Sequence, residues 1–356
     1  MILLKKLYNV VSSQDDSFVK VKLKPMLSEF TFNMIIRMVA GKQYNIGEEV
    51  TGKLEGKRLQ KLVEDLFQAG VSGNIGDFFP SLQWIDFQGF KKNTVRLFKE
   101  TDAFLQDLND EHRMNKGDFE REDTMISHFL SLQESQPEYY TDENIKAQMM
   151  DMLNASIDTI VSTIEWSMSN LLNNPNALEK TIAEVDCLVG QDKLLDEVHD
   201  LRKLNYLQNV ISETLRLHTI APLLIPHRSS DNCTLGGYHI PKDTMLFVNA
   251  WAIHRDPKLW DEPTSFRPDR FGNGEIDHET NYKLMPFGMG RRSCPGMDLA
   301  RRTVGLVLGL LIQCFEWKRV GEKEIDMTEG KGVTMPKAEP LEALCKAGDM
   351  ANKLLS

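Results

Sequence analysis

The sequence predicts a mainly α-helical protein with small β-sheets formed late in the chain. Apolar residues recur at helical spacing almost throughout residues 23–217. After Pro222 the pattern changes to short apolar segments around Gly236-Gly237, which is typical of strands joined by a tight turn. Residues 256–296 are rich in Pro, Gly, Asp and Arg and show little periodicity. A loop of that length inside a compact domain usually carries function.

The clearest single element is a long helix that begins after Thr141-Asp142. Its apolar positions are spaced three and four residues apart. They are Ile145, Met149, Leu153, Ile157, Ile160, Ile164, Met168 and Leu171. Asn174-Pro175 ends the pattern, so we expect a helix of about thirty residues, which crosses a whole domain at ~1.5 Å per residue.

The rest of the chain predicts short strands over residues 233–235, 238–240 and 245–248, and a final helix from about Met297 to Cys314. No internal repeat or linker interrupts the 356 residues. This length suffices for one large core, and we expect a single domain over residues 1–356.

Composition excludes several classes of protein. A formal net charge of −10 argues against nucleic-acid binding, because phosphate recognition requires a basic surface. No apolar run reaches the ~18 residues of a membrane span, so the chain as given is expected to be soluble. Five cysteines, an odd number without a CxxC pair, fit neither a disulfide framework nor a zinc module. We therefore expect a reducing compartment and one special thiol.

The strongest chemical signal is residues 286–296, Pro-Phe-Gly-Met-Gly-Arg-Arg-Ser-Cys-Pro-Gly. The sulfur of a metal-bound thiolate must be deprotonated, and a metal or a neighbouring positive charge lowers the pKa of the thiol. Backbone N–H groups should point at the sulfur, which favours a tight turn free of side chains. Gly288, Gly290 and Gly296 supply the conformational freedom for such a turn. The helix that begins just after Cys294 adds the positive end of its dipole.

Two side chains of the same segment suit a cofactor. Phe287 can pack beside the ligand and exclude water, and Arg292 can pair with an acidic cofactor group. The alternative is a glycine-rich surface turn that holds a buried cysteine. Phe287, Gly290, Arg292 and Cys294 coincide at the positions that a thiolate ligand requires, and this coincidence favours the metal site.

The segment resembles the haem-binding loop of the cytochrome P450 family, whose pattern is F-x-x-G-x-R-x-C-x-G. The resemblance implies haem b as the cofactor and Cys294 as the sulfur ligand of its iron. Arg292, Phe287, Gly290 and Gly296 are implied as cofactor-binding residues. The fold implied is that of the family without its N-terminal portion.

The resemblance predicts three further motifs of the family, and all are present. Two of them are Glu213-Thr214-Leu215-Arg216 and residues 266–271, Phe-Arg-Pro-Asp-Arg-Phe. By themselves, a Glu and an Arg three residues apart on a helix are a common surface pair that contributes little to stability. The resemblance implies a buried structural triad of Glu213, Arg216 and Arg270, which locks the loop that presents Cys294. Loss of one partner of such a triad costs ~3–5 kcal/mol.

Residues 155–159 of the long helix, Ala-Ser-Ile-Asp-Thr, resemble the oxygen-activation segment A-G-x-D-T. The resemblance implies catalytic roles for Asp158 and Thr159, which relay protons to bound dioxygen. The alternative is that the Thr159 hydroxyl only bonds back to the carbonyl of Ala155, as hydroxyls often do in helices. Ser156 stands where the family has glycine, which makes local opening of the helix harder.

His227 follows Pro226 and, by the resemblance, bonds a haem propionate together with Arg292. The neighbouring Arg228 is a competing candidate for that role. A substrate pocket is expected from three segments of the chain: the apolar run over residues 220–225, residues 332–335, and the face of the long helix around Met152. The residues expected to line it are Met152, Ala155, Ser156, Ile220, Ala221, Leu224, Val333 and Thr334.

Similarity to plant members of the family, above all the isoflavone 2′-hydroxylase group, extends along the whole chain. Residues 249–257 and 335–341 illustrate it. It implies insertion of one oxygen atom of O2 into a small, hydrophobic, aromatic substrate of flavonoid or isoflavonoid type. Electrons would come from NADPH through a cytochrome reductase at the cytosolic face of the endoplasmic reticulum.

The chain begins where the family is already past its membrane anchor, so we expect an N-terminally truncated form, cytoplasmic if no anchor holds it. The alternative function is a catalytically silent remnant that binds haem or a partner. One other motif, His254-Arg255-Asp256, is similar to a kinase catalytic loop. Pro257 follows it and no glycine-rich phosphate loop precedes it, so this interpretation is rejected.

Overall fold

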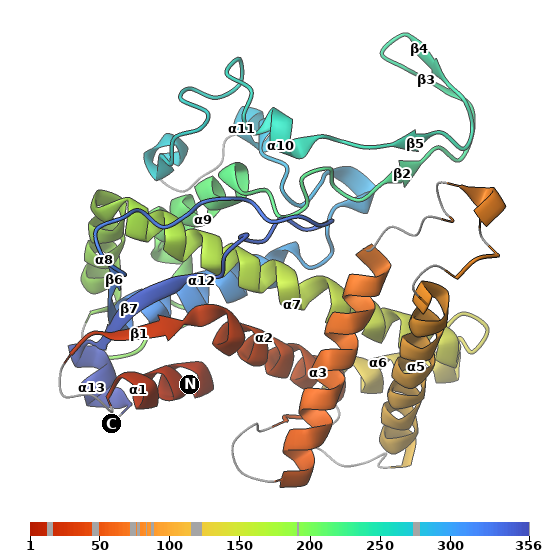
Figure 1. The fold of residues 1–356 in the computed structure, drawn as a ribbon, viewed down its shortest axis with the longest axis horizontal. Coiled ribbons are helices and arrows are strands. Elements are labelled where there is room, and N and C mark those ends of the chain that lie inside the picture. The colour runs from red at the N-terminus through yellow and green to blue at the C-terminus, as the bar shows by residue number, and fades with distance from the viewer. Residues whose placement is uncertain are drawn as a thin grey trace. The chain divides into compact units, whose positions relative to one another are not determined.

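The computed structural model describes residues 1–12, 17–44, 50–71, 76, 79–82, 84–86, 89–114, 123–190, 192–272 and 278–355 (Figure 1). These residues form two compact units. The first unit comprises residues 1–27 and 159–356, and the second comprises residues 28–158.

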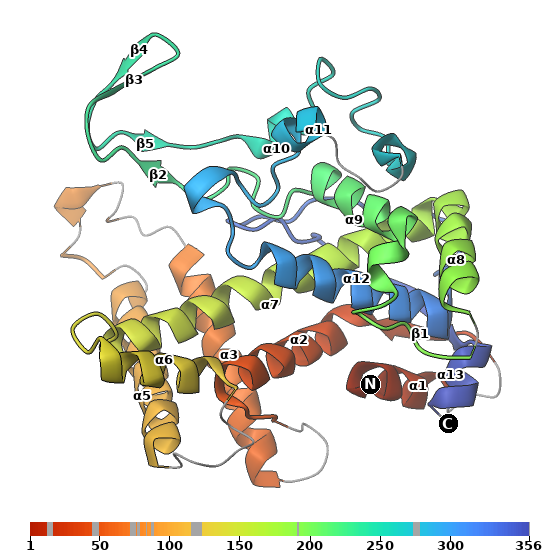
Figure 2. The same cartoon turned by 180° about the vertical axis from the view of Figure 1, so that it is seen from behind.

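Three helices of the first unit pack against one another: α8 (Pro175–Val189), α9 (Asn205–Leu217) and α12 (Met297–Cys314) (Figure 2). The predicted bounds of the last of these helices are confirmed. Two glycines let α12 approach its neighbours closely. A Cβ at Gly305 would lie 2.9 Å from Leu201, and one at Gly309 would lie 2.8 Å from Leu195. The small residues therefore set how near α12 lies to the chain that leads into α9.

A three-stranded antiparallel sheet has the order β1-β7-β6. Its strands are β1 (Val19–Lys22), β6 (Phe315–Arg319) and β7 (Glu342–Ala347). The helices α1 (Ile2–Val11) and α13 (Asp349–Leu354) contact β7. The sequence predicted β elements only late in the chain, and β1 was missed because its partner strand lies near the other terminus.

Two small hairpins follow α9. One pairs β2 (His227–Arg228) with β5 (Met245–Leu246), and the other pairs β3 (Cys233–Leu235) with β4 (Tyr238–Ile240). The turn between β3 and β4 has positive φ values of 58° at Gly236 and 86° at Gly237, as a two-residue hairpin turn requires. The predicted strand over 245–248 is shorter than expected and ends at Leu246.

The irregular stretch that the sequence predicted contains only short helical elements. They are α10 (Ala250–Ile253), η5 (Pro268–Phe271), α11 (His278–Lys283) and η6 (Gly290–Arg292), with η4 (Leu201–Lys203) preceding α9. The element η5 packs against α9. Trp260, Phe271 and Leu284 form a small buried cluster beneath this stretch.

The second unit is helical. It contains most of α2 (Leu23–Ala40), then α3 (Val50–Val71), η1 (Pro80–Leu82), α5 (Phe90–Met114) and α6 (Met125–Ser135). α5 packs against both α3 and α6. The Arg113 guanidinium at the end of α5 donates to the Asp142 carboxylate at 2.9 Å. Hydrogen bonding to Arg113 holds the pKa of Asp142 well below its usual range.

The long helix α7 (Asp142–Asn173) confirms the helix predicted from apolar spacing. Its first residues belong to the second unit, and its later residues, from Thr159, belong to the first. Pro175 occupies the first turn of α8 and separates it from α7. Across the described residues, no helix has the length and apolar character to cross a membrane.

Candidate functional site

Cys294 is an unpaired, exposed thiol in a turn just before α12. Its backbone N–H donates to the Phe287 carbonyl at 2.8 Å, which closes the loop on itself. The N–H of Met297 donates to the Cys294 carbonyl at 3.3 Å, so the cysteine leads directly into the helix. The sulfur therefore lies at a helix N-terminus, where the dipole favours a negative charge.

The three glycines around the Cys294 thiol have different structural roles. Gly288 has φ of 70° and Gly290 has φ of 74°, a region that side chains other than glycine rarely adopt. Gly296 has an ordinary φ of −88°, so backbone freedom is not its reason. A Cβ at Gly296 would lie 3.8 Å from the Cys294 sulfur. The expectation of turn freedom therefore holds for the first two glycines, while the third keeps the surroundings of the sulfur open.

Phe287 is half-buried beside the loop, and the Arg301 guanidinium of α12 lies 5.5 Å from its ring centroid. Burial lowers the pKa of Arg301, although that side chain remains a cation at any ordinary pH. The pair joins the start of the loop to the first turns of α12.

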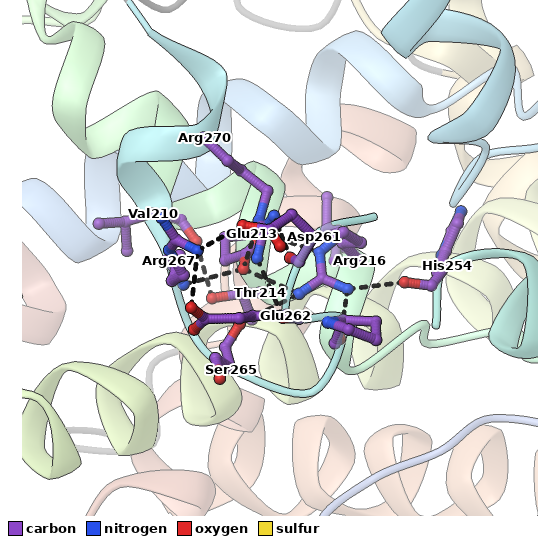
Figure 3. Close-up of polar contacts among 12 residues, drawn as sticks. Val210, Glu213, Thr214, Arg216, His254, Asp261, Glu262, Ser265, Arg267 and Arg270 are labelled. Atoms are coloured by element: carbon purple, nitrogen blue, oxygen red, sulfur yellow. Dashed lines mark hydrogen bonds and ion pairs between the residues drawn. The ribbon is translucent and has the colours of Figure 1, made fainter. Parts of the chain in front are cut away.

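The structure brings Glu213, Arg216 and Arg270 together in a buried network (Figure 3). Arg216 donates to both carboxylate oxygens of Glu213 at 2.8 Å, and the Nε of Arg270 donates to one of them at 3.0 Å. Glu213 and Arg216 are fully buried. Helical spacing of three residues places them on one face of α9, and η5 supplies Arg270.

Backbone carbonyls accept further hydrogen bonds from both arginines. Arg216 donates to the carbonyls of His254 at 2.6 Å, Pro263 at 2.7 Å and Ser265 at 3.2 Å. Arg270 donates to the Asp261 carbonyl at 2.8 Å. These contacts fix the irregular chain over residues 254–270 against α9. Regular secondary structure could not by itself order that part of the chain.

His254 lies between this network and the loop that carries Cys294. Its side chain is fully buried. The Nδ1 atom is 2.7 Å from the Thr219 hydroxyl, and the N–H of Met285 donates to Nε2 at 2.9 Å. The sequence interpretation dismissed this histidine with its kinase-like motif, and no local signal marks its partners, which are 35 and 31 residues away.

Arg292 is exposed and makes no ion pair or hydrogen bond with any residue that the structure describes. His227 is also exposed, in β2. The competing Arg228 is paired with Asp243 at 2.9 Å. Adjacent strand residues point to opposite faces, so the two side chains cannot serve the same site.

The predicted apolar wall over residues 220–225 adjoins the cysteine loop. Leu224 has an unfavourable φ of 53° and lies within 3.9 Å of a Cβ built on Gly288. Ile220 is buried, and its carbonyl accepts the N–H of Met335 at 2.9 Å. The structure thus brings the 220–225 segment next to the turn that ends with Val333 and Thr334, the other predicted pocket residues of this unit.

Trp166 on α7 also anchors that turn. Its indole N–H donates to the Met335 carbonyl at 2.9 Å, and both residues are buried. We expect Trp166→Phe to leave this carbonyl unpaired and to lower the free energy of unfolding by about 1–3 kcal/mol. Urea denaturation measures the change. Trp84→Phe, at a tryptophan that is 82% exposed, is the control and should have no effect; equal effects of the two would contradict the role of the indole.

The remaining predicted residues lie along α7. Met152, Ser156, Asp158 and Thr159 are half-buried, and Ala155 is exposed. The Ser156 hydroxyl donates to the Met152 carbonyl one turn earlier, as serine does within helices. The Thr159 carbonyl accepts from the Thr163 hydroxyl at 2.7 Å. Asp158 is the last residue of the second unit, and Thr159 begins the longer segment of the first.

Comparison with known proteins decides the family. Residues 1–342 match the family model described as Cytochrome P450. The chain belongs to the cytochrome P450 family. Cytochrome P450 81Q32 of Catharanthus roseus is 54% identical over 98% of this chain and 68% of its own length. Cytochrome P450 81E8 of Medicago truncatula is 52% identical over 93% of this chain and 65% of its own length.

A third relative carries a functional name. The isoflavone 2′-hydroxylase of Glycyrrhiza echinata is 49% identical over 96% of this chain and 67% of its own length. The chain spans about two thirds of the length of the curated relatives it matches. The predicted resemblance to plant members of the cytochrome P450 family is thus confirmed.

A haem, the cofactor of the cytochrome P450 family, fits the described residues. Cys294 presents a single thiol at a helix N-terminus. Such a thiol suits a metal ion whose other ligands are supplied by the haem ring. An exposed guanidinium at Arg292 suits the acidic edge of such a ring. Within the described residues, no three His, Cys, Asp or Glu side chains gather as a protein-only metal site.

Proposed function

We propose that this protein is a haem-dependent monooxygenase that inserts one oxygen atom of O2 into a small, hydrophobic, aromatic compound of flavonoid or isoflavonoid type. Two relatives named for isoflavone hydroxylation, at the 2′ and the 3′ position, are each 49% identical to the chain and support the substrate class. The observation that carries the proposal is Cys294: unpaired, exposed and fixed in a closed glycine turn.

Cys294 would hold the iron through its sulfur, which the α12 dipole favours as a thiolate. When bound, a haem supplies the metal centre at which dioxygen is activated. Arg292 and His227 would hold its carboxylates, and Phe287 would shield the sulfur from water. The buried network around Glu213 would keep the chain behind this loop from moving.

Asp158 and Thr159 would carry protons. A half-buried carboxylate exchanges a proton with water, and a neighbouring hydroxyl can pass it inward because it both donates and accepts. Ser156, whose hydroxyl is occupied by the Met152 carbonyl, would stiffen the helix next to this pair. The substrate would lie against apolar side chains such as Ile220, Leu224 and Val333.

Electrons would come from NADPH through a separate flavoprotein reductase. By its family, the protein would work at the cytosolic face of the endoplasmic reticulum. Incubation of the haem-loaded protein with such a reductase, NADPH and a panel of flavonoids under ¹⁸O2 tests the reaction. One ¹⁸O atom per product molecule is the expected result. Absence of any oxygenated product from protein that shows the thiolate spectrum would contradict the proposed reaction.

We expect Cys294→Ser to abolish the strongly red-shifted Soret band of the reduced carbon monoxide complex. The band depends on thiolate donation to iron, and a serine hydroxyl is not deprotonated under these conditions. The measurement is the difference spectrum after reduction by dithionite. Cys233→Ser, at another exposed thiol, is the matched control and should keep the band. A red-shifted band that persists in Cys294→Ser would overturn the assignment.

A further inference from the structure

His254 carries an inference that the family assignment does not supply. It is the residue after α10, it is fully buried, and three hydrogen bonds from segments distant in the chain converge on it. They join the Arg216 guanidinium to its carbonyl, Nδ1 to the Thr219 hydroxyl, and the Met285 N–H to Nε2. Both ring nitrogens are therefore engaged, each by a different segment of the chain.

The backbone partner fixes the tautomer. The N–H of Met285 can only donate, so Nε2 must offer a lone pair at 2.9 Å. The ring proton then lies on Nδ1 and is donated to the Thr219 oxygen at 2.7 Å. The Thr219 hydroxyl hydrogen is directed to the carbonyl of Leu215 or Arg216, at 3.2 and 3.3 Å. The arrangement is satisfied only by a neutral ring.

The ring links the ion-pair network to the cysteine loop. On one side, Arg216 belongs to the buried network and bonds the His254 carbonyl at 2.6 Å. On the other side, the Met285 carbonyl accepts the N–H of Gly288 at 3.0 Å. Gly288 follows Phe287, whose carbonyl accepts the Cys294 N–H at 2.8 Å. One continuous set of hydrogen bonds thus runs from α9 to the turn of the thiol.

We propose that His254 is a positioning residue for Cys294. In its neutral Nδ1–H form it fixes Met285, the residue just before the loop over 286–296, relative to the end of α9. Its effect on a metal-bound sulfur rests on the function proposed above, whereas its effect on the order of the loop does not. The alternative is a core histidine that stabilises the whole protein and has no particular effect on the loop.

Two substitutions separate these possibilities. Glutamine keeps an acceptor oxygen near the place of Nε2, whereas phenylalanine fills the ring volume without any acceptor. In His254→Phe we expect the amides of Met285 and Gly288 to exchange hydrogen at least about tenfold faster, a change of the size of one lost buried hydrogen bond. His254→Gln should keep most of the protection. Hydrogen exchange of the full chain, followed by mass spectrometry, measures both.

The same variants loaded with haem give a second readout. We expect His254→Phe to convert a large share of the red-shifted carbon monoxide band to the band of a neutral-thiol complex, and His254→Gln to restore it. The control is His112→Phe, at another buried histidine, whose Nδ1 is 2.9 Å from the Leu108 carbonyl. It should change the unfolding midpoint and leave the exchange of Met285 and Gly288 unchanged.

The proposal is overturned if His254→Phe leaves the exchange of Met285 and Gly288 unchanged, or if glutamine behaves as phenylalanine does. It is also overturned if ¹⁵N spectra of the full chain show the proton of His254 on Nε2. If the parent chain itself forms no thiolate complex, the proposed function fails, and hydrogen exchange of the haem-free chain still decides the role of His254. The two failures are therefore distinguishable.

Discussion

Replacement of Glu213 by glutamine is expected to lower the free energy of unfolding by about 3–5 kcal/mol. Glu213 is fully buried and accepts from Arg216, from Arg270 and from the backbone N–H of Arg267. A neutral amide would leave the buried Arg216 and the half-buried Arg270 without a counter-charge and would place an N–H₂ group among donors. Because a domain has only about 5–15 kcal/mol in total, a large part of its stability would be lost.

Urea denaturation followed by tryptophan fluorescence measures this loss, because the Trp260 ring lies 5.2 Å from the Arg216 guanidinium. The matched control is Glu197→Gln. Glu197 also faces an arginine, Arg302, at 3.8 Å, but both side chains are largely exposed. The control should change the stability by less than about 1 kcal/mol. A Glu213→Gln protein as stable as the control would show that the network contributes little.

Acidification is the second large effect. Burial, with the charges of Arg255, Lys337 and Arg216, lowers the pKa of His218 to about 3. Burial, with Arg216 and Arg255, lowers the pKa of His254 to about 4. The unfolded chain therefore takes up protons below about pH 6.5 while the folded protein does not, so stability falls as the pH falls. Between about pH 7.5 and about pH 5 each histidine accounts for a loss of about 2 kcal/mol.

The loss appears in urea denaturation curves recorded across this pH range. We expect the two histidines together to lower the free energy of unfolding by about 4 kcal/mol. In the parent protein the His218 ring stacks on Trp166 at a centroid distance of 3.9 Å. His218→Phe keeps a flat ring at this place and should remove half of the pH dependence. His239→Gln, at an exposed histidine, should leave it intact. A stability that is flat over this range would contradict the burial of neutral histidines.

Much of this structure could be predicted where a pattern is local. Apolar spacing predicted α7, and Pro175 marked its end, because helical periodicity and helix termination depend on near neighbours. The Gly236-Gly237 turn was predicted for the same reason. Glu213 and Arg216 were placed on one helix face by their spacing, and only the family resemblance added Arg270, which lies on another element.

The rest depends on partners that are distant in the chain. β1 alternates valine and lysine, which is a strand pattern, but the pattern lasts only four residues and its partner β7 lies far along the chain. The role of His254 depends on its hydrogen bonds with Thr219 and Met285, and no spacing rule in the sequence connects these three residues. Leu224 adopts a positive φ that a leucine would avoid in isolation. Such features are set by tertiary contacts, which override local preference.

The pairing of β1 with β7 has a consequence for the order of folding. β1 leaves the ribosome long before its partner strand Glu342–Ala347 is made. β1 cannot pair with β7 until Glu342–Ala347 has been made. Contacts of such long sequence separation form slowly. The apolar face of α1, which includes Leu3, Leu4 and Leu7, would stay uncovered through that interval and would be a natural target for chaperones in the cell.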